Sequence, residues 1–381
     1  MKNTNYKIPY VNLGKQHNFY IKPFQASLKK FLKSGQFILG EHVREFEKNF
    51  SKYIGTKFAI GVGSGTDALY LSLKYLNLKK NDEVITVANS YLSTVSVIHL
   101  VGARPVLVDV NYNDYNIDVK KIEKKITKNT KVILPVHLCG VPAKMNIIRK
   151  IAKKYNLRII EDCAQATGAS IGKKKVGTFG FSGCYSFHPL KTLNAIGDGG
   201  MIVTNNKRFY KWLIRARNNG HPSRDLCDFW SHNMRLDALH AMFLNKKLKN
   251  YERVISKRNR NVNLYRSKLD KNIVLQEVNK NCKSVYQTFI VKTKKRKKLI
   301  NFLKSKKIEA KIHYPIPIHK LKAFKNTNKK FFFLPITEKL SKEIITLPAM
   351  EYLSEKQISY IIKKINVFFK KEKKKRKKKW S

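Results

Sequence analysis

The feature that most constrains the fold is an alternation of short strand-like runs with helical patterns between about residue 57 and residue 205. The strand-like runs are Phe58–Val62, Val84–Ala88, Pro105–Val110, Lys131–His137 and Arg158–Glu161. Helical patterns such as Thr66–Leu76 and Met145–Tyr155 lie between most of them. This alternation predicts an α/β fold with a mostly parallel sheet covered on both faces, whose ligands gather at the carboxyl ends of the strands.

The 381 residues are enough for two domains. After about residue 235 the pattern becomes helical, and Asp237–Leu269 reads as one long amphipathic helix. The last third mixes a strand at Gln287–Val291 with helices at Lys294–Lys306 and Ser354–Phe369. We therefore expect a large domain with an N-terminal arm over residues 1–245, a small C-terminal α/β domain over 246–369, and a tail over 370–381.

Lysine dominates the charge of the chain: 79 Lys+Arg against 25 Asp+Glu give a net charge of +54. The densest run, Lys370–Trp380, should be disordered because like charges repel and bury nothing. Such a balance fits nucleic acid or an anionic membrane as partner, or simply a lysine-biased composition. Contact with nucleic acid or membrane is not favoured, because no basic patch interleaved with aromatics is present.

Cysteine usage points to a cytoplasmic protein. The five cysteines are odd in number, widely spaced and without a Cys-X-X-Cys pair, which predicts reduced, mostly buried thiols and no zinc site. The N-terminus lacks the apolar core of a signal peptide. The longest stretch without a charged side chain, Val84–Ala103, contains Asn89 and His99, so we interpret it as strand plus helix and not as a membrane span.

The first segment that could carry chemistry is GSGTDAL, Gly63–Leu69, which follows a strand and opens a helix. Small residues let the backbone approach a ligand, and the helix N-terminus attracts an anion such as phosphate. A glycine-rich turn without a ligand is the simpler alternative.

Two further segments supply an acid and an amine. Asp162 falls at the end of a buried-looking strand, where it faces a cationic ligand group or caps the next segment; Gln165 reaches the same site or faces solvent. In SFHPLK, Ser186 offers a hydroxyl, Pro189 argues against a helix and Lys191 offers an amine. A phosphate cup, a buried carboxylate and a lysine that captures a carbonyl are what pyridoxal 5'-phosphate (PLP) requires.

The chain resembles the DegT/DnrJ/EryC1/StrS family of PLP-dependent sugar aminotransferases from Gly35 to Ile358. The resemblance rests on ordered motifs: SGTDAL, DEVITVANSYLST, VLVDV, EDCAQATGA, SFHPLKTLNAIGDGGMI, HNMRLDALHA and HYPIPIH. It implies an aspartate-aminotransferase-like fold, which is fold type I of the PLP enzymes, and a homodimer with shared active sites.

The resemblance also implies residue roles. Lys191 would bond to the cofactor and then transfer protons, Asp162 would pair with the pyridinium nitrogen, and Gln165 would contact the ring hydroxyl. Tyr91 would stack on the ring, with core packing as the alternative. The phosphate would be held by Gly65, Thr66, Ser186 and, from the partner subunit, Asn233. Three side chains would line the sugar site or merely belong to loops: His188, His313 and Tyr314.

The implied reaction moves an amino group from an amino acid, L-glutamate above all, to a keto sugar on a nucleotide diphosphate, for surface polysaccharide or related glycans. A basic cleft would attract such an anionic substrate. The segment NDYNID, Asn113–Asp118, resembles members that aminate the 3-position of deoxy sugars. The alternatives are another PLP reaction, such as that of the family's dehydratases, in which histidine replaces the lysine, and a non-catalytic basic protein bound to nucleic acid or membrane.

Overall fold

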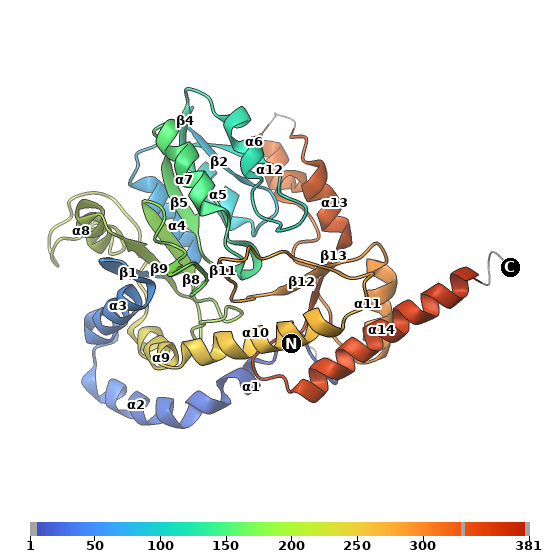
Figure 1. The fold of residues 1–381 in the computed structure, drawn as a ribbon. Helices are drawn as coiled ribbons and strands as arrows, with labels where there is room; N and C mark the ends of the chain where they lie inside the picture. The colour runs from blue at the N-terminus through green and yellow to red at the C-terminus, as the bar shows by residue number, and fades with distance from the viewer. Residues whose placement is uncertain (1–5, 329–331, 378–381) are drawn as a thin grey trace.

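The computed structural model describes residues 6–328 and 332–377, and a seven-stranded sheet forms its centre (Figure 1). The strand order is β1-β9-β8-β5-β4-β2-β3. The strands are β1 Phe58–Val62, β2 Glu83–Val87, β3 Arg104–Val108, β4 Thr130–Ile133, β5 Arg158–Asp162, β8 Ser182–Ser186 and β9 Gly200–Thr204. Every pair in the sheet is parallel except the two that β9 makes with β1 and β8. The predicted α/β class with a mostly parallel sheet is therefore confirmed.

Hydrophobic clusters cover both faces of this sheet. Successive residues of β9 alternate between them: Ile202 packs with one cluster, and Met201 and Val203 pack with the other. The first face is covered by α4 Gly65–Lys74, α5 Ser93–Leu100 and α8 Lys207–Ala216. The opposite face is covered by α3 Gly40–Ile54, α7 Met145–Lys154 and α9 Ala238–Leu248.

The C-terminal third builds a second, antiparallel sheet of order β10-β12-β13. Its strands and helices are β10 Val274–Leu275, β12 Phe289–Lys292, β13 Ile344–Leu347, α10 Tyr251–Lys268, α11 Arg296–Ser305 and α14 Glu355–Lys377. Ile8 and Tyr10 pack in the same hydrophobic cluster, and Ile8 bridges to Ile308. Ile8 and Tyr10 thus lie against the C-terminal third, while the exact domain boundaries stay a prediction.

Short elements complete the described chain. The helices are α1 Leu13–His17, α2 Ile21–Ser34, α6 Val119–Ile122, α12 Lys322–Thr327 and α13 Pro335–Glu343, with 3-10 turns at Asn18–Tyr20, Glu123–Lys125, Leu138–Gly140 and Ile318–Lys320. A small third sheet joins β11 Cys282–Lys283 to β6 Ser170–Ile171 and β7 Lys174–Lys175. Within residues 6–328 and 332–377, none of the helices combines the length and apolar character needed to cross a bilayer.

The long helix predicted over Asp237–Leu269 is wrong, because the chain breaks it into α9 and α10. The break falls at Asn250, whose φ of −110° and ψ of 11° leave the helical region. Asparagine competes with the helix backbone for hydrogen bonds and favours such positions. The break lets α9 pack on α3, against the large sheet, while α10 packs on α14 in the C-terminal third.

The start of the predicted disordered tail is also different, because α14 continues past Phe369 to Lys377 (Figure 1). The Glu372 carboxylate forms an ion pair with the Lys295 ammonium group at 2.5 Å. Lys295 lies directly before α11. This attachment and the good helix propensity of lysine favour continuation of the helix. Residues 378–381, the rest of that predicted tail, lie outside the described residues.

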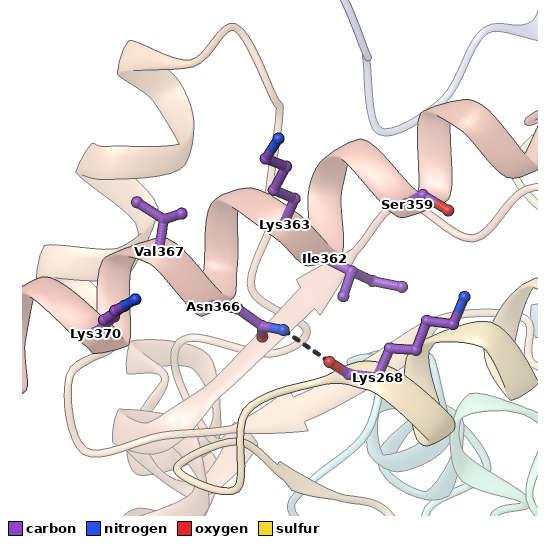
Figure 2. A pocket seen from close by; sticks show the side chains of 7 residues that line it. All are labelled: Lys268, Ser359, Ile362, Lys363, Asn366, Val367 and Lys370. Atoms are coloured by element: carbon purple, nitrogen blue, oxygen red, sulfur yellow. Dashed lines mark hydrogen bonds between the residues drawn. The ribbon is translucent and has the colours of Figure 1, made fainter.

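Figure 2 shows a surface groove between the end of α10 and α14, where the Asn366 side chain donates to the Lys268 carbonyl at 2.8 Å. Lys363 and Lys370 also line it. None of its lining residues belongs to the cavity described below. Exposed lysines of this kind occur throughout the part of the chain that the structure describes, so nucleic-acid or membrane contact by the C-terminal region stays a prediction that is not favoured.

A buried carboxylate anchors the end of β5. Glu161 is fully buried and accepts hydrogen bonds from the backbone N–H groups of Gly177, Phe179 and Gly180 at 2.7–2.8 Å. It also contacts Nε2 of His137 at 3.1 Å. Cys163 lies close enough to complete a geometric metal cluster, but the carboxylate oxygens are already used by these donors. The cluster is therefore a structural hydrogen-bond network.

We expect Glu161→Gln to lower the free energy of unfolding by about 2 to 4 kcal/mol, because the new amide group would face a backbone donor in a dry site. Urea unfolding followed by circular dichroism measures this. Glu123→Gln is the control, since it alters an exposed contact with Lys154 at 2.9 Å and should leave the midpoint unchanged. Equal midpoints for Glu161→Gln and wild type would contradict the anchoring role.

Candidate active site

A cavity of about 480 Å³ lies at the carboxyl ends of β1, β2, β5 and β8. Ligands of open α/β sheets bind at this edge. The cavity is lined by ten of the eleven predicted site residues: Gly65, Thr66, Tyr91, Asp162, Gln165, Ser186, His188, Lys191, His313 and Tyr314. Segments more than 100 residues apart in the chain therefore meet around one space.

The N-terminus of α4 forms one wall of the cavity. Gly65 and Thr66 open this helix, so their N–H groups have no acceptor within it. A Cβ on Gly65 would come within 2.7 Å of the Ser186 Cβ, so only glycine allows α4 to approach β8 this closely. Thr66 and Ser93 place their hydroxyl oxygens 2.8 Å apart beside it. Two hydroxyls and a helix N-terminus fit a phosphate group.

Asp162 supplies a buried carboxylate at the end of β5. Its Oδ2 accepts from the Thr94 hydroxyl at 2.8 Å and its Oδ1 from the Ala164 N–H at 3.1 Å. Burial raises the pKa of this carboxyl, against the opposing effect of these donors and of Lys191. A cationic group in the cavity would relieve that cost of desolvation.

Lys191 lies on the loop after β8, where burial lowers the pKa of its amine and the nearby Asp162 carboxylate opposes the shift. Among the described residues, burial also lowers the lysine pKa at Lys247, to about 7, and at Lys292, to about 8. Neither of these two lines the cavity. Lys191 thus combines a desolvated amine with access to the cavity, the condition for a nucleophilic lysine.

The amide of Gln165 already has protein partners in the structure. Its Oε1 accepts from the Cys139 N–H at 2.8 Å, and its Nε2 donates to the Tyr314 hydroxyl at 3.1 Å. Tyr91 is 53% exposed, with its ring centroid 6.4 Å from that of Tyr314. The alternative that Tyr91 is a core residue is therefore wrong, because its ring borders the cavity instead.

The two histidines differ in their surroundings. His188 is exposed at the cavity rim. His313 contacts the Thr346 hydroxyl through Nδ1 at 3.0 Å, and burial together with Lys191 lowers its pKa to about 4. His313 is therefore neutral at physiological pH and offers a hydrogen bond without charge.

Asn233 is the predicted site residue that does not line this cavity. It is exposed, and its backbone pairs with Asn218. Its role as a contact from the partner subunit to the cofactor phosphate stays a prediction.

The structure adds side chains that we did not predict from the sequence. Thr94, which holds Asp162, lies within the NSYLST motif and follows Tyr91 by three residues, so the motif itself was a signal. Other additions come from distant segments with no such signal: Tyr10, Gln287 and Thr288. The Thr288 hydroxyl is buried beside the weakly hydrogen-bonding Cys139 thiol, so a polar ligand atom would give it a stronger partner.

Comparison with known proteins agrees with this geometry. A profile of the DegT/DnrJ/EryC1/StrS aminotransferase family matches residues 20–366. The dTDP-3-amino-3,6-dideoxy-alpha-D-galactopyranose transaminase of Aneurinibacillus thermoaerophilus is 39% identical, with 94% of this chain and 99% of that protein covered. The UDP-N-acetyl-3-dehydro-alpha-D-glucosamine 3-aminotransferase of Acidithiobacillus ferrooxidans is 36% identical, with 94% and 96% covered.

A solved structure extends the similarity to three dimensions. S. venezuelae DesV, in complex with a ketimine intermediate, superposes with a TM-score of 0.93 at 30% identity, covering 96% of this chain and 99% of that one. The aspartate-aminotransferase-like fold expected from the resemblance is therefore confirmed. The chain belongs to the DegT/DnrJ/EryC1/StrS aminotransferase family and is a transaminase whose cofactor is pyridoxal 5'-phosphate.

Proposed function

We propose that this transaminase moves the amino group of L-glutamate to the keto carbon of a sugar carried on a nucleotide diphosphate. The observation that carries the proposal is the cavity in which Lys191, Asp162 and the N-terminus of α4 meet. These groups match the aldehyde, the ring nitrogen and the phosphate of the cofactor. The product would enter the synthesis of surface polysaccharide or related glycans.

The contacts support a role for each of these residues. When bound, the cofactor supplies a carbonyl carbon for the lysine and a protonated ring that withdraws electrons. Asp162 would keep the ring nitrogen protonated, and Thr94 would hold that carboxylate in place. Lys191 would bind the cofactor and then carry a proton between carbon atoms of the substrate and cofactor, a task for which its lowered pKa suits it.

The relatives support the kind of substrate. The Aneurinibacillus and Acidithiobacillus enzymes are named for a dTDP-linked and a UDP-linked sugar, and both names specify the 3-position. We therefore propose amination at the 3-position. The NDYNID segment, Asn113–Asp118, does not line the cavity, so it would not read the sugar directly. The Asn116 side-chain oxygen instead accepts a hydrogen bond from the Leu138 N–H at 3.0 Å. The next residue, Cys139, donates its N–H to Gln165.

A homodimer with shared sites would complete the cavity. Tyr91 and Leu190 line it and are 53% and 44% exposed. Trp230, three residues before Asn233, is 93% exposed. Exposed apolar side chains at the cavity and near Asn233 favour coverage by another chain, and we propose that Asn233 of each subunit reaches the site of the other.

The first alternative, a dehydratase-like reaction, is disfavoured because a lysine occupies position 191 where that subgroup is expected to carry histidine. A non-catalytic protein that binds nucleic acid or membrane rests on charge alone. A non-catalytic function would not explain why the Asp162 carboxylate and the Lys191 amine are both buried at the cavity.

Asp162→Asn tests the cofactor contact. Burial raises the pKa of the Asp162 carboxyl in the cofactor-free fold. The protonated carboxyl therefore stabilises the folded state in acid. This contribution is lost as the pH rises from the ordinary carboxyl pKa through the raised one. At pH 8 the cofactor-free variant should therefore melt at or above the wild-type temperature. Added PLP should raise its melting temperature less than half as much as it raises that of wild type.

The matched control is Asp114→Asn, which changes another carboxyl whose pKa burial raises, outside the cavity. It should retain the full stabilisation by PLP. Differential scanning fluorimetry at several PLP concentrations measures both variants. Equal stabilisation of Asp162→Asn and wild type would remove Asp162 from the cofactor site.

The substrate proposal is tested by incubating the enzyme with L-glutamate and dTDP- or UDP-linked 3-keto sugars and measuring 2-oxoglutarate and amino-sugar release. Lys191→Ala should lower kcat by on the order of 1,000-fold or more, because it loses both the covalent and the proton-transfer group. Lys292→Ala, which removes a buried lysine outside the cavity, should retain most activity. Borohydride reduction and peptide mapping should place the cofactor on Lys191 and not on Lys247 or Lys292.

Activity on simple keto acids alone would overturn the sugar assignment, and a deoxygenated product without an amino group would favour the dehydratase alternative. If the purified protein carries no cofactor and binds DNA in a salt-sensitive manner, the non-catalytic alternative would be favoured.

The shared site is tested by mixing two inactive variants, Asn233→Ala and Lys191→Ala, under conditions that exchange subunits. A mixed dimer would then contain one site with both residues intact, so up to about half of its sites should recover. Activity against mixing ratio measures this. Exchange shown by mass spectrometry without recovery would count against a contribution from Asn233 of the partner subunit.

A further inference from the structure

One side chain from the C-terminal third spans the peptide groups on both sides of Lys191. The Gln287 Nε2 donates to the Leu190 carbonyl at 2.7 Å, and its Oε1 accepts from the Thr192 N–H at 2.9 Å. Gln287 is 6% exposed and lines the cavity. A single carboxamide therefore fixes the backbone immediately before and after the lysine.

The backbone at Gln287 is in turn held by the side chain of Arg258. Arg258, which is 1% exposed, donates through Nη1 to the carbonyls of Tyr286 at 3.1 Å and Gln287 at 3.3 Å. The Arg258 Nε in turn donates to Glu351 at 2.9 Å. The position of Gln287 is thus set by α10 and the segment after β13, not by the loop that it holds.

Apart from those of Gln287, the hydrogen bonds that side chains outside this loop make to it act after the lysine, while within the loop the Asn194 side chain donates to the Pro189 carbonyl. The Thr192 hydroxyl lies 2.5 Å from that of Tyr251, and the Lys247 Nζ donates to the Asn194 carbonyl at 3.1 Å. The loop has no regular secondary structure at Lys191. Among the side chains of residues 6–328 and 332–377, Gln287 is the one whose hydrogen bonds bracket it.

We propose that Gln287 is a positioning residue for Lys191, holding its backbone so that the amine points into the dry part of the cavity toward Asp162. The inference rests on the role proposed above for Lys191. Without the two hydrogen bonds the loop gains freedom, the amine samples other positions, and water reaches it. A displacement of about 1 Å at a reacting group costs on the order of 100-fold in rate.

The test compares Gln287→Met with Gln276→Met. Methionine matches glutamine in length but forms neither hydrogen bond. Gln276 is the control because it is 3% exposed and donates to the Asp114 carbonyl at 2.7 Å, a similar buried contact away from the loop. Gln287→Met should lower kcat by about 10- to 100-fold, with the KM for L-glutamate changed less than about threefold. Gln276→Met should keep the wild-type kcat.

A second measurement separates positioning from a general structural role. In the cofactor-free protein, the pH dependence of Lys191 acetylation by acetic anhydride, read by mass spectrometry, gives the midpoint of its titration. Burial lowers the pKa of Lys191 in the native loop. In Gln287→Met the midpoint should rise toward that of an ordinary lysine, because the amine becomes hydrated. In Gln276→Met it should match wild type.

Gln287→Glu is the second variant if Gln287→Met does not fold. It keeps the acceptor for Thr192 and loses the donor to Leu190, so kcat should fall as well; because the added carboxylate raises the Lys191 midpoint by its charge alone, kcat is the readout for this variant. If the folded variants keep both wild-type values while Lys191→Ala is inactive, the positioning role is wrong and the proposed function stands. If Lys191→Ala retains amino transfer, the proposed function fails and this inference fails with it.

Discussion

The active cavity depends on two consecutive buried carboxylates at the end of β5. Successive side chains of a strand point to opposite faces, so Glu161 turns toward the backbone N–H groups of Gly177, Phe179 and Gly180, while Asp162 turns toward Thr94 and the cavity. The first carboxylate is fully used in holding the strand to its surroundings. The second accepts from Thr94 and Ala164 and borders the cavity, where a ligand can reach it. The carboxylate that holds the fold and the carboxylate that borders the cavity therefore belong to adjacent residues.

The surplus of positive charge does not select the reactive lysine. Most lysines are solvated, and three described ones are desolvated enough to have a lowered pKa: Lys191, Lys247 and Lys292. Lys247 is occupied by the Asn194 carbonyl, and Lys292 by that of Tyr112 at 2.6 Å. Lys191 alone of the three borders the cavity. Burial combined with access, and not charge, distinguishes it.

The cavity is assembled from the large sheet, from the C-terminal third and from the segment that contains Tyr10. The large sheet contributes Asp162 and Ser186, the segment before β12 contributes Gln287 and Thr288, and Tyr10 comes from the N-terminal segment. A change in the packing of the C-terminal third would therefore move groups that touch the lysine loop. The hydrogen bonds of Gln287 make this coupling specific, because they reach the peptide groups next to Lys191.

The sequence by itself determined the α/β class, the family, and a set of site residues of which all but Asn233 border one cavity. These follow from local periodicity and from motifs that are each contiguous in the chain. The tertiary structure alone decided the break at Asn250, the continuation of α14 to Lys377, and the position of Gln287 beside Lys191. Asparagine and lysine supply local preferences at the first two places, but whether those preferences prevail depends on which helix faces must be buried and on contacts such as that of Lys295 with Glu372. The position of Gln287 depends on contacts between residues far apart in sequence, which no local pattern encodes.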